Sequence, residues 1–252
     1  VWMFQRDSED MMVGFTGSRC LDPDDPAEWR ELAIKKQCQC PDPSEPQPRK
    51  QGPWRRRHES LVQDVQYFQD SKVAFLGDSI TERWNRTENR AVFDQYFGSD
   101  TSLPGVALGT SGDITTELLW HVQNGMLPEV PVFVVLIGTS DLGRSGCSKG
   151  VVLAGILQVL KYVRTTRPNS QIIVHALLPR NDVYRDGNYT LGRYWVDIQY
   201  INTELERLCK LHGWHYLNVN EIFLDGTTIR KDLMSDALHP DLEGYKLWAP
   251  LI

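Results

Sequence analysis

The sequence lacks the two features that would tie the chain to a membrane or to nucleic acid. Its longest apolar run, residues 130–137, is interrupted by Pro131 and is far too short to span a bilayer, so it is typical of a buried strand. An excess of positive charge is also missing, because 33 acidic side chains outnumber 27 basic ones and give a formal net charge of -6. A mildly acidic chain has no global electrostatic attraction to nucleic acid or anionic lipid.

Nucleotide-binding motifs and a recognisable leader are absent as well. Neither a Gly-x-Gly-x-x-Gly pattern nor a phosphate-binding P-loop occurs, which argues against a nucleotide-binding α/β protein. The chain starts at Val1, shows no signal peptide and stops within an expected terminal element. We interpret it as processed or trimmed, so a targeting segment or an anchor could have been removed.

The cysteines cannot all pair within one chain, because there are five: Cys20, Cys38, Cys40, Cys147 and Cys209. The first three lie in a polar, proline-rich stretch, where we expect one disulfide if the compartment is oxidising. Two closely spaced cysteines at 38 and 40 without matched partners make a poor zinc site, so we predict no metal.

The location of the protein is only weakly indicated. Glycosylation sequons begin at Asn85 and Asn188, and about one would be expected by chance. Together with the clustered cysteines they slightly favour a secreted or lumenal protein and leave a cytoplasmic one open. A homodimer is possible, but no feature of the sequence supports one.

The chain divides into an irregular extension, residues 1–53, and a regular domain, residues 54–252. The extension contains clustered prolines and little apolar periodicity, with one short helix expected near 27–36. The domain opens with apolar residues at helical spacing over 54–69. The length of the whole chain, 252 residues, and its 24% of charged residues suit one α/β domain with an added segment.

Short apolar runs then alternate with helical patterns. Strands are predicted at 73–76, 103–108, 132–137, 172–178 and 214–219, and helices at 81–97, 115–123, 151–166 and 194–212. This alternation indicates βαβ crossovers and a parallel sheet covered on both faces. Functional residues are therefore expected at the carboxyl ends of the strands.

Ser79 stands at one such strand end, in the sequence Gly-Asp-Ser at 77–79, which opens a helix. The partial positive charge of a helix N-terminus favours a developing negative charge there. The plainer interpretation is that Ser79 only caps the helix, since Asp-Ser before a helical run is common.

A base for this serine is offered by Asp236 and His239 near the C-terminus. Serine needs a base to become nucleophilic, and a carboxylate on the second ring nitrogen of histidine fixes its tautomer. The alternative is an aspartate that caps a turn beside a surface histidine. Two glycine-containing segments, 109–113 and 138–141, follow the second and third predicted strands, and each could equally be a plain βα loop.

Together, Gly-Asp-Ser, then Gly112, then Gly-Thr-x-Asp, then Asp-x-x-His resemble the four sequence blocks of the SGNH (GDSL) hydrolases, over about residues 54–252. Within that superfamily the sequence is most similar to the catalytic subunits of intracellular platelet-activating factor acetylhydrolase and related esterases. The supporting stretches are 111–120, 124–125, 177–180, 236–240 and 243–245.

The resemblance implies a three-layer α/β/α sandwich with a flavodoxin-like, parallel five-stranded sheet. It implies that Ser79 attacks an ester carbonyl, that His239 takes and returns the proton, and that Asp236 orients His239. The oxyanion hole would use the backbone N–H groups of Ser79 and Gly112 and the side chain of Ser140. Supporting roles are implied for two further acidic residues, Asp78 and Asp113, with no cofactor.

Ser140 departs from the family, which normally has asparagine there. The loss of one oxyanion-hole donor typically costs about 10²–10³ in rate. Three interpretations are open: a water bridged by Ser140 serves instead, the substrate geometry differs, or the enzyme is slow or inactive. The retained triad favours an active enzyme.

The predicted function is hydrolysis of carboxylic esters, with short acetyl-type acyl groups on a lipid, sugar or small alcohol. Acyl transfer or thioester hydrolysis with the same residues is an alternative, as is a catalytically impaired domain that binds a partner. Among other histidines, His175 is interpreted as a satisfied core residue, and His58 and His121 show no pattern of partners.

Overall fold

The computed structural model describes residues 40–181, 184–185 and 188–252. Its main sheet has five parallel strands in the order β2-β1-β3-β4-β7. These strands are β1 (Val73–Gly77), β2 (Gly105–Gly109), β3 (Val132–Leu136), β4 (Gln171–His175) and β7 (His215–Leu217). Every residue of β1 and β2 is buried, because helices cover both faces of the sheet.

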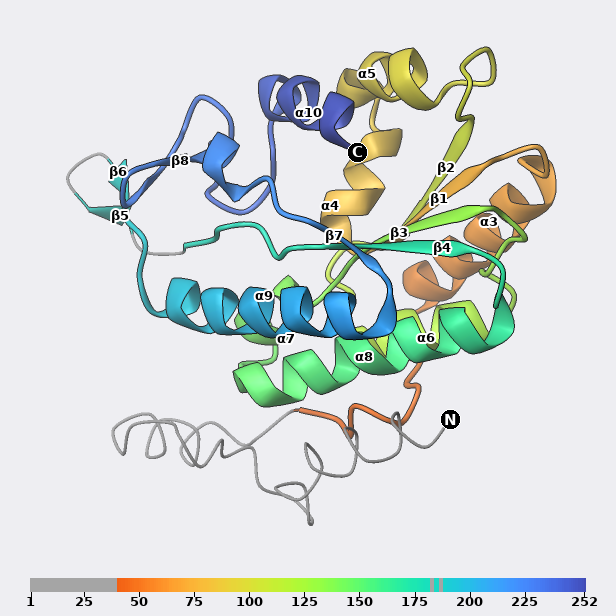
Figure 1. The fold of residues 1–252 in the computed structure, drawn as a ribbon, viewed down its shortest axis with the longest axis horizontal. Coiled ribbons are helices and arrows are strands. Elements are labelled where there is room, and N and C mark those ends of the chain that lie inside the picture. Colours follow the sequence, from red (N-terminus) through yellow and green to blue (C-terminus); the bar gives the residue numbers. More distant parts are fainter. Residues whose placement is uncertain (1–39, 182–183, 186–187) are drawn as a thin grey trace.

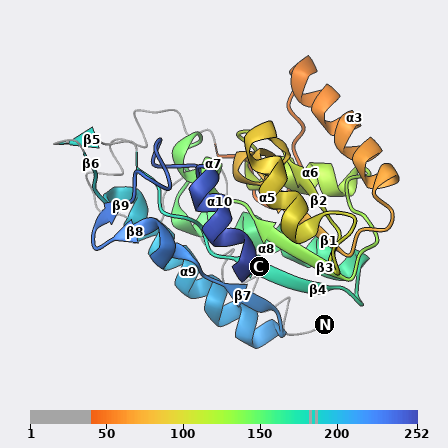
Figure 2. The same ribbon diagram turned by 90° about the horizontal axis from the view of Figure 1, so that it is seen from above.

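The helices form a layer on each face. On one face lie α4 (Ser79–Glu82), α5 (Thr87–Phe97) and α10 (Leu242–Trp248), and on the other lie α6 (Thr115–Gln123), α8 (Lys149–Thr166) and α9 (Arg193–His212) (Figures 1 and 2). The short α7 (Thr139–Gly143) follows β3, and α3 (Gly52–Tyr67) packs beside β2. This is the α/β/α arrangement expected from the sequence, and it confirms the predicted fold class.

Smaller elements complete the chain. The 3-10 helices are η1 (Arg83–Asn85), η2 (Asn220–Phe223) and η3 (Ala249–Leu251). The antiparallel pairs are β5 (Tyr184–Arg185) with β6 (Asn188–Tyr189), and β8 (Leu224–Asp225) with β9 (Thr228–Ile229). A bridge between Thr190 and Thr228 joins the two pairs.

Most predicted elements differ from the structure by one to three residues at an end, and two of them differ for a reason that the side chains show. The helix expected over 81–97 breaks at Arg86, which is extended (φ -72°, ψ 147°). Just before the break, the Asn85 side chain donates to the Ala107 carbonyl on the free edge of β2, 2.8 Å away, a bond that competes with helix continuation. The strand expected over 172–178 ends at His175, because the side chain of Asn202 bonds both the N–H and the carbonyl of Leu177.

The disulfide expected among the first three cysteines is wrong for Cys40, which bonds Cys147, 107 residues away. Residues 40–51 fold back onto the domain and bring the two Cα atoms within 5.6 Å. Cys209 is free and buried. Cys20, Cys38 and the helix expected near 27–36 lie outside the described residues.

The strand order brings the loop after β1 and the loop after β3 to a common point at one edge of the sheet. β1 lies between β2 and β3, yet the chain leaves β1 toward α4 and α5 on one face, and leaves β3 toward α8 on the other. Such a switch point opens a crevice at the carboxyl ends of the strands. Ser79 follows β1, and Ser140 follows β3.

Candidate active site

The turn after β1 holds Ser79 in a fixed position at the start of α4. Asp78 is the N-cap of this helix, and its carboxylate accepts the Ile80 N–H at 3.0 Å. The backbone of β2 approaches closely, since a Cβ atom on Gly109 would lie 2.4 Å from the Glu82 nitrogen. Ser79 is 9% exposed, so its hydroxyl borders the surface while its backbone is held from both sides.

The turn at 236–239 aims a histidine at that serine. Asp236 Oδ1 accepts the backbone N–H groups of Leu238 and His239 at 3.0 and 2.7 Å. Its Oδ2 lies 2.6 Å from His239 Nδ1. Among the described non-glycine residues, Ala237 alone has a positive φ, of 54°. This left-handed residue folds the turn tightly enough for one carboxylate to hold both the backbone and the ring of His239.

Ser79 and His239, 160 residues apart, meet across the crevice, with 2.8 Å between Ser79 Oγ and His239 Nε2. Because Nδ1 faces the Asp236 carboxylate, the neutral ring carries its proton there and leaves Nε2 free to accept the serine proton. The structure thus brings together the three residues predicted from the sequence. This arrangement can activate a serine for attack on a carbonyl carbon.

Electrostatics favour an ionised Asp236. Burial by itself would raise its pKa, but hydrogen bonds from the ring and backbone of His239, and from Leu238, hold the pKa well below its usual range. Arg83 adds a longer contact, 3.4 Å from Oδ2. The carboxylate can therefore keep its charge and stabilise a protonated His239.

Residues behind the triad fix its two turns. Asp241 accepts the Ser235 N–H at 2.7 Å, and the Asn181 N–H donates to the Ala237 carbonyl at 3.0 Å. The Tyr245 hydroxyl, buried on α10, donates to the Ile80 carbonyl at 2.6 Å. Tyr245 occurred in the sequence only as part of a family-like stretch, and its contact with the serine turn could not be inferred from spacing.

Three donors predicted for the oxyanion hole are available. Gly112 has φ 72°, and its N–H bonds to no residue in the described part of the chain, nor does the N–H of Ser79. The Ser140 hydroxyl likewise has no hydrogen-bond partner among these residues, and Ser140 is 7% exposed. Each sits at the carboxyl end of a different strand of the β2-β1-β3 group.

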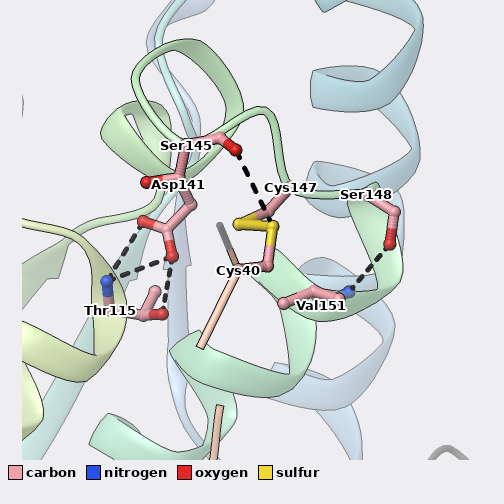
Figure 3. Close-up of a disulfide and its surroundings, with 7 residues drawn as sticks. All are labelled: Cys40, Thr115, Asp141, Ser145, Cys147, Ser148 and Val151. Carbon is pink, nitrogen blue, oxygen red and sulfur yellow. Dashed lines mark hydrogen bonds between the residues drawn. A yellow bond between two sulfur atoms is a disulfide. The ribbon is translucent and has the colours of Figure 1, made fainter. Parts of the chain in front are cut away.

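The loops that carry Gly112 and Ser140 are tied to each other. Asp141, on α7, accepts the backbone N–H of Thr115 at 3.1 Å and its hydroxyl at 2.7 Å (Figure 3). Burial raises the pKa of Asp141 to about 7, against the bonds from Thr115. Arg180 donates to the Thr139 carbonyl at 2.5 Å and packs on Gly143, which holds α7 from the other side.

The predicted supporting residues differ in what they support. Asp78 caps the serine helix, and burial raises its pKa to about 7. Asp113 is fully buried and is bonded by Trp54 Nε1 at 2.8 Å and by Arg49 at 2.9 Å. Burial raises the pKa of Asp113 well above the usual value, although both bonds oppose this. Asp113 therefore anchors the N-terminal segment to the loop of Gly112.

A histidine pair behind Asp113 escaped the sequence analysis. The Nδ1 atoms of His58 and His121 lie 2.8 Å apart, and His121 Nε2 lies 3.1 Å from Asp113. Burial lowers the pKa of both histidines, that of His121 to about 3, so the pair is neutral and shares one Nδ1 proton. Only the packing of α3 against α6 brings them together, so spacing along the chain held no signal for the pair.

The described residues contain no group of three or more histidine, cysteine or acidic side chains that could hold a metal ion. None of the helices in the described ranges has the length and apolar character needed to cross a membrane.

Comparison with known proteins shows the family to which the chain belongs. The model of the GDSL-like lipase/acylhydrolase family matches residues 75–247. The chain belongs to this family and is a hydrolase.

Particular relatives agree with that class. The chain is 27% identical over 203 residues to human platelet-activating factor acetylhydrolase IB subunit alpha1, covering 77% of this chain and 78% of the relative. The alpha2 subunit of Rattus norvegicus is 27% identical over 207 residues, covering 79% and 81%. A GDSL-like lipase of Bacteroides thetaiotaomicron shares the fold, with a TM-score of 0.63, 19% identity, and coverage of 77% and 94%.

Proposed function

We propose that the protein is a serine esterase that hydrolyses carboxylic esters with short acyl groups. The observation that carries this proposal is the hydrogen-bonded chain of Ser79, His239 and Asp236. Ser79 Oγ lies 2.8 Å from His239 Nε2, and His239 Nδ1 lies 2.6 Å from Asp236 Oδ2. Its similarity to proteins named as acetylhydrolases supports an acetyl-type acyl group. The alcohol part is a lipid, a sugar or a small alcohol.

The proposed reaction has two halves. His239 Nε2 accepts the proton of Ser79 as Oγ bonds to the ester carbonyl carbon, and the carbonyl oxygen becomes an oxyanion. The N–H groups of Ser79 and Gly112 and the hydroxyl of Ser140 donate to that oxygen. The intermediate then collapses, the C–O bond to the alcohol breaks, and His239 returns the proton to the leaving alcohol.

Water completes the cycle by the same steps. It attacks the acyl-serine while His239 accepts its proton, and Ser79 leaves with that proton as the carboxylic acid is released. Asp236 stays ionised throughout and stabilises the imidazolium that forms twice. An acceptor other than water would turn the same residues into an acyltransferase.

The test is hydrolysis of p-nitrophenyl acetate, butyrate and octanoate by wild-type protein and by Ser79→Ala. We expect turnover that is highest for acetate and that falls by at least about 10⁴-fold in the variant. The variant should keep the melting temperature of the wild type. Wild-type turnover no higher than that of Ser79→Ala on all three esters would contradict the proposal and favour an impaired domain that binds a partner.

A further inference from the structure

Residues 40–51, here called the strap, run across the α6 and α8 side of the domain before α3 begins (Figure 1). Three kinds of bond hold the strap: the disulfide from Cys40 to Cys147, a backbone bond from the Gln47 N–H to the Thr116 carbonyl at 3.0 Å, and the side chain of Arg49. An irregular segment with this many bonds to the domain is part of its structure.

Arg49 contacts the loop on both sides of Gly112. Its guanidinium donates to the Ser111 carbonyl at 3.2 Å and to the Asp113 carboxylate at 2.9 Å. A Cβ atom built on Gly112 would lie 3.5 Å from the same group. The guanidinium therefore lies along the turn that contains the free Gly112 N–H.

Glu117 completes the attachment. It lies 2.8 Å from Arg49 and accepts the Ile114 N–H at 2.9 Å, just after the same turn. Hydrogen bonds from Arg49 and Ile114 outweigh burial and lower the pKa of Glu117, so Arg49 faces two acidic groups in a site where its side chain is only 16% exposed. A planar guanidinium bonds these acceptors from separate nitrogens held in a fixed fork, whereas an ammonium is a single point charge without that geometry.

The strap also touches the loop that follows Ser140. Cys40 is bonded to Cys147, beside Asp141 and its bonds to Thr115 (Figure 3). Glu117 is shared by Arg49 from the strap and by Arg144 at the end of α7, at 2.8 Å each. One irregular segment thus contacts both loops that bear the proposed oxyanion donors other than Ser79, namely the loops of Gly112 and Ser140.

Hydrogen-bond donors stabilise an oxyanion only when they are held about 2.7–3.1 Å from the position it will occupy. The Gly112 turn has one internal backbone bond, from the Asp113 N–H to the Thr110 carbonyl at 3.1 Å. Without Arg49, the Ser111 carbonyl would have no partner among the described residues, and the peptide between Ser111 and Gly112 could rotate.

We propose that Arg49 is a positioning residue of the esterase, which fixes the peptide between Ser111 and Gly112 so that the Gly112 N–H points at the oxyanion. This inference rests on the proposed function. Because the peptide would be better aligned with the oxyanion than with the planar ester, Arg49 acts on kcat more than on KM.

The test measures kcat and KM for p-nitrophenyl acetate with Arg49→Gln, Arg49→Lys and the matched control Lys50→Gln. Lys50 is exposed on the same strap and loses the same charge. We expect kcat to fall about 10-fold or more in Arg49→Gln, with KM within about 3-fold of wild type, no change in Lys50→Gln and partial rescue in Arg49→Lys.

Equal kcat values for Arg49→Gln and Lys50→Gln would overturn the inference. If Arg49→Gln does not fold, Arg49→Lys decides, because lysine lacks the two separate nitrogens that bond Ser111 and Asp113 in a fixed geometry. A wild-type kcat in Arg49→Lys would also overturn the inference. Wild-type protein without Ser79-dependent turnover would instead refute the proposed function, so the two failures are distinguishable.

Discussion

At the scale of single residues, Ser140 is the predicted oxyanion donor that departs from the family, which normally has asparagine there. It is the second residue of α7, and its hydroxyl lies near the carboxyl end of β3. A serine hydroxyl is shorter than an asparagine amide and can rotate toward other acceptors. The other two predicted donors are backbone N–H groups in the turns of Ser79 and Gly112.

Ser140→Asn should therefore raise kcat for p-nitrophenyl acetate by about 10-fold or more, because an amide fixed by its side chain restores one oxyanion donor. The measurement compares kcat of wild type, Ser140→Asn and Ser140→Ala. An unchanged kcat in Ser140→Asn, with turnover still dependent on Ser79, would exclude position 140 as a donor.

At the scale of elements, the strap contacts both the loop of Gly112, through Arg49, and the loop after Ser140, through the Cys40–Cys147 disulfide. Its disulfide closes a span of 107 residues between Cys40 and Cys147, which includes α3, β1, β2 and β3. Such a cross-link stabilises the folded chain mainly by restricting the unfolded one. Disulfides persist in oxidising compartments, which supports our proposal that the protein is secreted or lumenal.

The Cys40→Ser, Cys147→Ser double variant should lose about 2–4 kcal/mol of unfolding free energy. Urea unfolding of the variant and of oxidised wild type measures the loss, and wild type with dithiothreitol should approach the variant. If the urea midpoint were the same for the double variant, for oxidised wild type and for wild type with dithiothreitol, the cross-link would add no stability.

At the scale of the whole molecule, buried ionisable groups change the stability of the fold in opposite directions as the pH falls. Burial lowers the pKa of His175 to about 4, against the bond between its ring and the Ala176 carbonyl. The unfolded chain then takes up this proton first, so the stability contributed by neutral His175 is present above about pH 6.5 and is lost toward pH 4. Asp78 and Asp141, with pKa values raised to about 7, act with the opposite sign between about pH 4 and 7.

Substituting His175→Phe removes one side of this balance. As the pH falls from 7 to 4, wild type should lose up to about 3 kcal/mol of unfolding free energy that the variant does not lose, because the variant has no histidine to protonate there. Urea unfolding of both proteins at pH 7 and pH 4.5 measures the change. The same difference between the proteins at both pH values would rule out a proton-linked penalty at His175.

By itself, the sequence determined the fold class and the three residues of the candidate triad. Alternating strand and helix patterns specify a parallel sheet because apolar periodicity follows local backbone geometry. The carboxyl ends of the strands specify where functional residues gather, and Ser79 lies at the end of β1. The prediction that Asp236 and His239 complete its site rested on the resemblance of four sequence blocks, in their order, to the SGNH hydrolases.

Only the tertiary structure decided which segments meet. The pairing of Cys40 with Cys147, the contact of His58 with His121, and the reach of Arg49 to the Gly112 loop each join residues more than 60 positions apart. Local propensity carries no information about such contacts, because they follow from how the strap and α3 pack on a completed sheet. The physical reason is that burial and side-chain bonding are properties of the packed molecule, and residue spacing fixes only the elements that do the packing.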